Sequence, residues 1–268
     1  METVLQSAAE ALVWALGLLL LLSLSVACEG GFRLGLWRGS RTSTATGELT
    51  ATSTITAGML GLLAFMLGLT VNFAQNRFEA RREMVAVEAN AIGTAWLRAK
   101  LVGGPDGDAL AVQIADYAQT RLAFTQADYT GPIDRLNVRS AEQQQKIWAL
   151  VTSVARKSPT AISATLINAV NDMIDASLSQ RFAFETRVPG GMILMLVVGS
   201  LIAIAAMGYE LGLVGHRQPV LTSLLLLMWT GGIVMTVDLN RPRLGAIRVE
   251  TAPLEWTIKE FRATPAAP

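Results

Sequence analysis

Reactive side chains are scarce in this sequence, which contains one histidine, His216, and one cysteine, Cys28. A single cysteine excludes a disulfide within one chain, and these two residues are too few for a zinc site of histidine and cysteine ligands. The sequence also lacks a phosphate-binding glycine loop, a zinc-protease motif and the glycine-flanked serine of the hydrolases. Only carboxylate chemistry is left as a route to catalysis. We therefore expect no enzyme, no metal site and no cofactor.

Charged residues are also few, at 16% of the chain, whereas an average soluble domain has about 25%. The net charge of +1 offers no basic footprint for nucleic acid, so we expect no nucleic-acid partner. Hydrophobic residues make up 51% of the chain. This composition favours a membrane protein.

Four uncharged segments are long enough to cross a bilayer, whose hydrocarbon core requires about 20 apolar residues of helix. We expect spans at residues 11–27, 51–74, 189–209 and 218–237. The second lies in a run of 28 residues between Glu48 and Arg77 that holds no ionisable side chain. Residues 1–4 carry no positive charge, which is atypical of a signal peptide, so we interpret the first segment as a retained span. A lipoprotein cleavage box at residues 25–28 is the weaker alternative.

The arginines near the spans predict their orientation. One side holds both termini and the long segment between spans 2 and 3, and it carries Arg77, Arg81, Arg82, Arg181, Arg187, Arg241, Arg243 and Arg248. The other side carries Arg33, Arg38, Arg41 and Arg217. Because basic residues are enriched in cytoplasmic segments, we expect both termini and the middle segment in the cytoplasm.

Residues 77–187 show helical periodicity and no strand-like alternation. Phe78, Val85, Ile92 and Trp96 share one helical face, which predicts that the second span continues into this segment until residues 103–105, Gly-Gly-Pro, end the helix. We expect further helices at residues 108–125, 140–157 and 161–184, the second of them capped by Ser140 after a loop.

The predicted fold is an all-α membrane protein with four transmembrane helices and a helical cytoplasmic domain between spans 2 and 3. We divide the chain into residues 1–76 with spans 1 and 2, a cytoplasmic domain at 77–187, spans 3 and 4 at 188–238, and a cytoplasmic tail at 239–268.

The second span holds more small and polar residues than contact with lipid requires. Ala57, Gly61, Ala64 and Gly68 form a smooth strip that is typical of close helix packing. Another face predicts a path with an apolar constriction and a polar exit. Its candidate lining residues are Thr54, Gly58, Phe65, Leu69, Asn72 and Asn76. Ordinary packing and lipid contact remain the alternative interpretation of this face.

Charged residues close to the spans are candidates for a vestibule or for structural ion pairs. Glu88 lies between Val85 and Ile92, either as a proton-sensitive group along a path or as the partner of an arginine on a neighbouring helix. The fourth span ends in charged residues that suit a vestibule, an ion-pair clasp or a simple stop-transfer signal. The full candidate set is Arg77, Arg81, Glu88, Arg98, Asp238, Arg241 and Arg243.

Three stretches of sequence carry a resemblance to a known family. They are residues 76–82 (Asn-Arg-Phe-Glu-Ala-Arg-Arg), 88–99 (Glu-Ala-Asn-Ala-Ile-Gly-Thr-Ala-Trp-Leu-Arg-Ala) and 238–249 (Asp-Leu-Asn-Arg-Pro-Arg-Leu-Gly-Ala-Ile-Arg-Val). Together they resemble the bacterial bestrophin-like family of four-span membrane proteins, a domain of unknown function. Its name suggests kinship with bestrophins, which are pentameric ion channels whose second span lines the pore.

The resemblance implies a homo-oligomeric ion channel of the bacterial inner membrane, a pentamer if it assembles as bestrophins do, in contact with lipids and inorganic ions. No counterpart of the acidic calcium clasp of animal bestrophins is visible, so calcium gating is not expected. Basic residues near the cytoplasmic mouth mildly favour anions. The alternative is a non-conducting membrane scaffold or sensor whose helical domain binds a partner.

Overall fold

A computed structural model describes residues 2–41, 46–127, 130–243 and 247–263. Within these ranges the chain forms eight helices and no strand. The helices assemble into two compact units. Unit 1 comprises Met1–Arg77, Arg187–Arg241 and Gly245–Ile247, and unit 2 comprises Phe78–Thr186, Pro242–Leu244 and Arg248–Pro268. The all-α fold with four membrane helices, predicted from the sequence, is confirmed.

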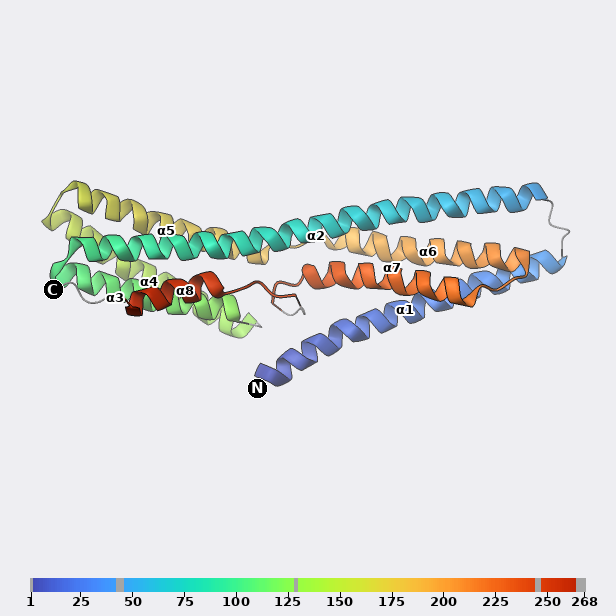
Figure 1. The fold of residues 1–268 in the computed structure, drawn as a ribbon, viewed down its shortest axis with the longest axis horizontal. Helices are drawn as coiled ribbons and strands as arrows, with labels where there is room; N and C mark the ends of the chain where they lie inside the picture. The colour runs from blue at the N-terminus through green and yellow to red at the C-terminus, as the bar shows by residue number, and fades with distance from the viewer. Residues whose placement is uncertain (1, 42–45, 128–129, 244–246, 264–268) are drawn as a thin grey trace. The chain divides into compact units, whose positions relative to one another are not determined.

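Unit 1 contains the four candidate spans. Its helices are α1 (Glu2–Arg41), the first part of α2 (Thr46–Val102), α6 (Gly190–Val214) and α7 (Pro219–Leu239). Apolar stretches long enough to cross a membrane lie in the ranges Val13–Arg41, Leu49–Val102, Ala161–Val214 and Pro219–Leu239. Figure 1 shows α1 running obliquely to α6 and α7.

Four glycines bring the backbones of α1 and α6 into direct contact. A Cβ added at Gly31 or Gly35 would overlap the carbonyl oxygens of Ala205 and Tyr209. On α6, a Cβ at Gly208 or Gly212 would overlap carbonyl oxygens of α1 in the same way. Each pair is separated by four residues, which is the spacing that lets two membrane helices cross at close range.

A hydrogen bond between α6 and α7 stabilises the core of unit 1. The indole N–H of Trp229 donates to the hydroxyl of Ser200 over 2.7 Å, and both side chains are buried. At one end of the unit, the backbone N–H of Val188 donates to the side chain of Asn240 over 2.7 Å. Because hydrocarbon offers no competing partner, such bonds hold the start of α6 against the end of α7.

Unit 2 is a helical bundle made of the rest of α2, α3 (Gly104–Gln126), α4 (Thr130–Lys157), α5 (Ala161–Glu185) and α8 (Ala252–Ala263). Gly103, with φ of 67°, makes the turn that ends α2, as the sequence predicts. Apolar residues from all five helices share one core, among them Val85, Ile92, Leu110, Ile114, Ile147, Val151, Leu166, Met173, Leu254 and Ile258.

Two features of unit 2 differ from the sequence prediction. The predicted cap at Ser140 is wrong, because α4 begins at Thr130 and Ser140 lies buried inside it. Gly131 and Pro132 fall in the first turn of α4, where a proline costs no helical hydrogen bond. The second difference is α8, which the sequence pattern did not predict. It packs into the core, and its Phe261 stacks on Trp96 of α2 at 4.6 Å.

Candidate functional site

The candidate path residues lie on one face of α2. At 100° per residue, Thr54, Gly58, Phe65, Leu69, Asn72 and Asn76 fall within an arc of about 60°. All six are exposed, with Phe65 62% and Leu69 40% accessible. Asn76 donates a side-chain hydrogen bond of 3.1 Å to Asn72 on the same face. Within the residues that the structure describes, this face therefore packs against little of its own chain.

The face of α2 that packs inside unit 1 is nearly opposite. Thr56, Thr70 and Ala74 are buried there, and the Leu63 side chain reaches Gly199 of α6. These positions lie about 160° around the helix from the candidate path face. The chain's own packing thus turns the path face outward.

The two flanks of the exposed face differ in size. On one flank Ala57, Gly61, Ala64 and Gly68 are small, and a Cβ at either glycine would meet no atom within 4 Å. On the other flank the exposed side chains are large, namely Ile55, Leu62 and Phe73. The predicted packing strip is consequently open in the single chain, since none of the described parts of unit 1 covers it.

In unit 2, Glu88 of α2 belongs to a buried polar network. Its carboxylate accepts hydrogen bonds from the Arg121 guanidinium of α3, the shorter at 2.5 Å. Arg121 also donates to Gln180 of α5, and Gln180 donates to Thr125 over 3.2 Å. Phe124 lies against the guanidinium at 4.3 Å. The Glu88 side chain is 0% exposed and that of Arg121 is 3% exposed, so water does not screen the pair.

Burial dominates the electrostatics of this network. It raises the pKa of the Glu88 carboxyl above the ordinary value, and the neighbouring Arg121 guanidinium opposes that shift. Burial likewise raises the pKa of Tyr117, whose hydroxyl accepts a hydrogen bond from Gln144 over 2.9 Å. The network holds α2, α3 and α5 together through polar groups that are almost completely buried.

The other candidate arginines of unit 2 bind backbone carbonyls. Arg81 is 0% exposed and donates to the carbonyl oxygens of Ala183 and Thr186. Arg98 donates to that of Thr165 over 2.6 Å.

Arg243 binds two carbonyls of unit 2 and lies over two rings. It donates to the carbonyl oxygens of Phe124 and Ala127, and its guanidinium lies over the rings of Phe124 and Phe184. In unit 1, the Asp238 carboxylate accepts from the N–H of Ile247, Arg241 is half-buried and Arg77 is exposed.

Comparison with known proteins decides the family. The Bestrophin-like domain matches residues 17–254, which is most of the chain. The chain belongs to the Bestrophin-like family. This confirms the resemblance drawn from the sequence motifs. No curated protein matches the sequence.

Solved structures share the fold of this bestrophin-like chain at low sequence identity. A bacterial Bestrophin homolog from Klebsiella pneumoniae is 14% identical, with a TM-score of 0.60 over 91% of this chain and 94% of that one. A single-substitution variant of that homolog is 13% identical, with a TM-score of 0.67 over 94% and 97%. At this level of identity the match establishes the fold.

Sequence reasoning offered an arginine on a neighbouring helix as one possible partner of Glu88 in this bestrophin-like chain, but it identified neither Arg121 nor Gln180. A signal for Arg121 was present, because it falls on the apolar face of α3 with Leu110, Ile114 and Tyr117, where a charge needs a buried partner. Nothing marked Gln180, which lies 59 residues from Arg121. Among the described residues, no group of three or more His, Cys, Asp or Glu side chains could hold a metal ion.

Proposed function

We propose that the chain forms a homo-oligomeric ion channel of the bacterial inner membrane, with both termini in the cytoplasm and a path lined by α2. The observation that carries this proposal is the orientation of α2 in unit 1. The face with Thr54, Gly58, Phe65, Leu69, Asn72 and Asn76 is exposed, and the opposite face packs against the chain's own helices. A ring of copies would turn the first face to a common axis.

The flanks of α2 support such a ring. In a closed ring, each copy contacts the next through two different surfaces. The small flank at Gly61 and Gly68 offers a groove, and the large flank at Leu62 and Phe73 offers side chains to fill it. Close packing at small residues is one of the forces that drive helix association in lipid, where no hydrophobic force acts between helices.

Phe65 and Leu69 supply the proposed gate. Apolar side chains at a narrow point of a pore impede ions because water leaves the constriction. Asn72 and Asn76 follow on the same face and offer amide groups to ions beyond the constriction. Basic residues near the cytoplasmic mouth of the proposed path favour anions over cations, so we expect an anion-selective channel.

Glu88 and Arg81 have a different role in this proposal. Both are fully buried inside unit 2 and have protein partners, so we assign them to the interior of the bundle and not to the path. The part of α2 that lies in unit 2 also has an exposed stripe, which stays a candidate for contact with solvent and ions. It comprises Glu83, Val87, Asn90, Thr94, Leu97 and Leu101.

Planar bilayer recording of the purified protein tests the proposal. The double variant Phe65→Ala/Leu69→Ala should pass larger unitary currents than the wild type, because its constriction is wider and wetter. A matched control is Leu194→Ala/Leu221→Ala, which truncates two side chains of other spans that are each 64% exposed. The control should conduct like the wild type, and a salt gradient should give an anion-selective reversal potential.

One result would refute the channel, and another would refute the path along α2. Silence from wild type and path variant, with oligomers confirmed in the same preparation, would favour a scaffold or sensor whose helical unit binds a partner. Equal gains in the path variant and the control would remove α2 from the path.

A further inference from the structure

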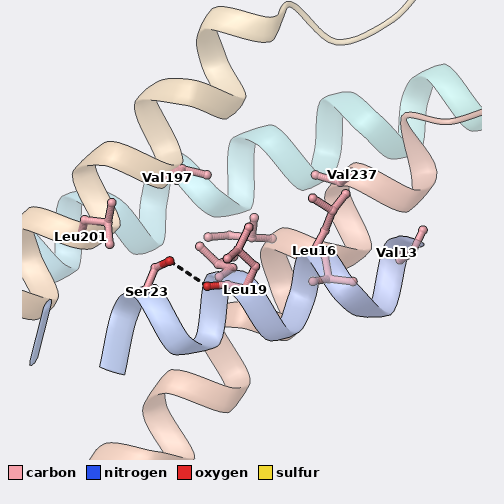
Figure 2. A pocket seen from close by; sticks show the side chains of 10 residues that line it. Val13, Leu16, Leu19, Ser23, Val197, Leu201 and Val237 are labelled. Carbon is pink, nitrogen blue, oxygen red and sulfur yellow. Dashed lines mark hydrogen bonds between the residues drawn. The ribbon is translucent and has the colours of Figure 1, made fainter. Parts of the chain in front are cut away.

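Unit 1 contains a cavity of about 260 Å³ between α1, α6 and α7 (Figure 2). Its position follows from the crossing of α1 and α6. The helices touch at Gly31, Gly35, Gly208 and Gly212, and α1 runs obliquely from there toward its N-terminus. The cavity opens along this half of α1. Its lining residues are Val13, Leu16, Leu19, Leu20, Ser23, Val197, Leu201, Ile233, Val234 and Val237.

The lining is almost entirely apolar. Nine of its ten residues are aliphatic, and the hydroxyl of Ser23 already donates to the carbonyl oxygen of Leu19 over 2.7 Å (Figure 2). A buried water needs two to four polar partners, so water is disfavoured here. Apolar cavities of about 150 Å³ hold a benzene ring, and by proportion this one accommodates about ten hydrocarbon carbons. A lining of this kind favours a hydrocarbon as the occupant.

We propose that the cavity binds one acyl chain of an anionic phospholipid. Its lining lies within the candidate spans, so bilayer hydrocarbon surrounds its open side. Leu16 and Leu19 are 38% and 61% exposed, and they form a rim through which a chain enters laterally. A second copy of the protein is a poorer occupant, because close helix packing requires small residues. Leucine dominates the lining stretch of α1, and the Cβ position of its Gly17 already faces Val234 of the same chain at 3.1 Å.

Basic residues at one end of unit 1 select the headgroup. Arg241 follows Val237 of the lining by four residues, and Arg187 directly precedes Val188. The hydrogen bond from Val188 to Asn240 brings the chain segments of both arginines together. Asn240 lies about 10 Å along the helix direction from Ile233 of the lining, at 1.5 Å per residue. A phosphate at the level of the arginines would thus place its acyl chain in the cavity.

Native mass spectrometry of the full chain, reconstituted with phosphatidylglycerol or phosphatidylcholine vesicles and re-extracted in mild detergent, tests this site. Wild type should retain one phosphatidylglycerol per protomer. Val197→Phe fills the cavity, whereas the control Val198→Phe adds the same bulk at an exposed neighbouring position. If only two methylene groups of the acyl chain lose their burial, the affinity for the lipid falls roughly tenfold. We expect at least a tenfold loss of bound lipid from Val197→Phe and no change from the control.

Two more variants keep the test decisive if Val197→Phe fails to fold. Leu16→Phe fills the cavity from its exposed rim and should give the same loss. Arg241→Gln should keep the lipid but reduce the ratio of phosphatidylglycerol to phosphatidylcholine toward one.

Three results would overturn the site. They are equal retention in all variants, equal loss from Val197→Phe and Val198→Phe, or a changed oligomer mass with unchanged lipid, which would show that a neighbouring copy fills the cavity. Because the readout is bound lipid, the result does not depend on whether the protein conducts.

Discussion

Replacing Arg121 by methionine tests whether Glu88 lies in a dry bundle interior or in a water-filled vestibule. The two side chains are 0% and 3% exposed, so their attraction is unscreened. Removing one partner of a buried pair costs about 3–5 kcal/mol of unfolding free energy, because the other charge stays buried without compensation. An exposed pair contributes only about 0–1 kcal/mol. The structure predicts the larger loss for Arg121→Met.

Urea titration of the full chain in detergent, followed by far-ultraviolet circular dichroism, measures this loss. With a urea m value of about 2 kcal/mol/M, the unfolding midpoint of unit 2 should fall by roughly 1.5–2.5 M. The matched control is Arg139→Met, which changes an exposed arginine of α4. Its expected effect is within about 0.5 kcal/mol.

The double variant Glu88→Gln/Arg121→Met removes both charges and should recover most of the lost stability, because no charge then remains buried alone. A loss below about 1 kcal/mol in Arg121→Met, with additive behaviour in the double variant, would refute the buried interior. Glu88 would then face water and would again be a candidate residue of the vestibule.

Two further predictions concern pH and helix packing. Burial raises the pKa of Glu88 above its ordinary value of 4.5, so between these two values the native state binds more protons than the unfolded state. The stability that this group contributes is complete below about pH 4.5 and is lost as the pH rises through the raised pKa. Urea unfolding midpoints measured across this pH range should decline in the wild type and not in Glu88→Gln. Gly208→Val should cost roughly 1–3 kcal/mol or more, because even its Cβ would overlap the backbone of Cys28. Gly231→Val is the matched control, because a Cβ at Gly231 would meet no atom within 4 Å. Thermal melts in detergent, read by size-exclusion chromatography, compare the two, and equal melting would contradict the close crossing.

The spans were predictable because their signal is local. Length and hydropathy are properties of one segment, and they sufficed for all four membrane helices. The arc of Thr54 to Asn76 also follows from helical spacing within one segment. The side of α2 that packs inward could not be predicted from the segment alone, because the buried Thr56 and Thr70 are no more apolar than the exposed Leu62. It became clear only from the positions of the neighbouring helices.

Contacts between distant segments could not be predicted. The pairing of Glu88 with Arg121 joins residues 33 apart on different helices, and no sequence rule connects them. The only sign in the sequence of the close crossing of α1 and α6 is two pairs of glycines spaced by four residues. Such spacing does not by itself say which other helix the glycines contact. The start of α4 was misjudged because Ser140 resembles a cap, while Pro132 at the true first turn resembles a loop.

The contribution of α8 constrains how the protein is made. Leu254 and Ile258 are buried in the core of unit 2, yet they follow the last span in the chain. A nascent chain that has just emerged through α5 therefore cannot complete this core, and α6 and α7 must be synthesised first. Until α8 is synthesised, part of the apolar core of unit 2 stays exposed. The folding of unit 2 is therefore completed only after the last membrane span has been made.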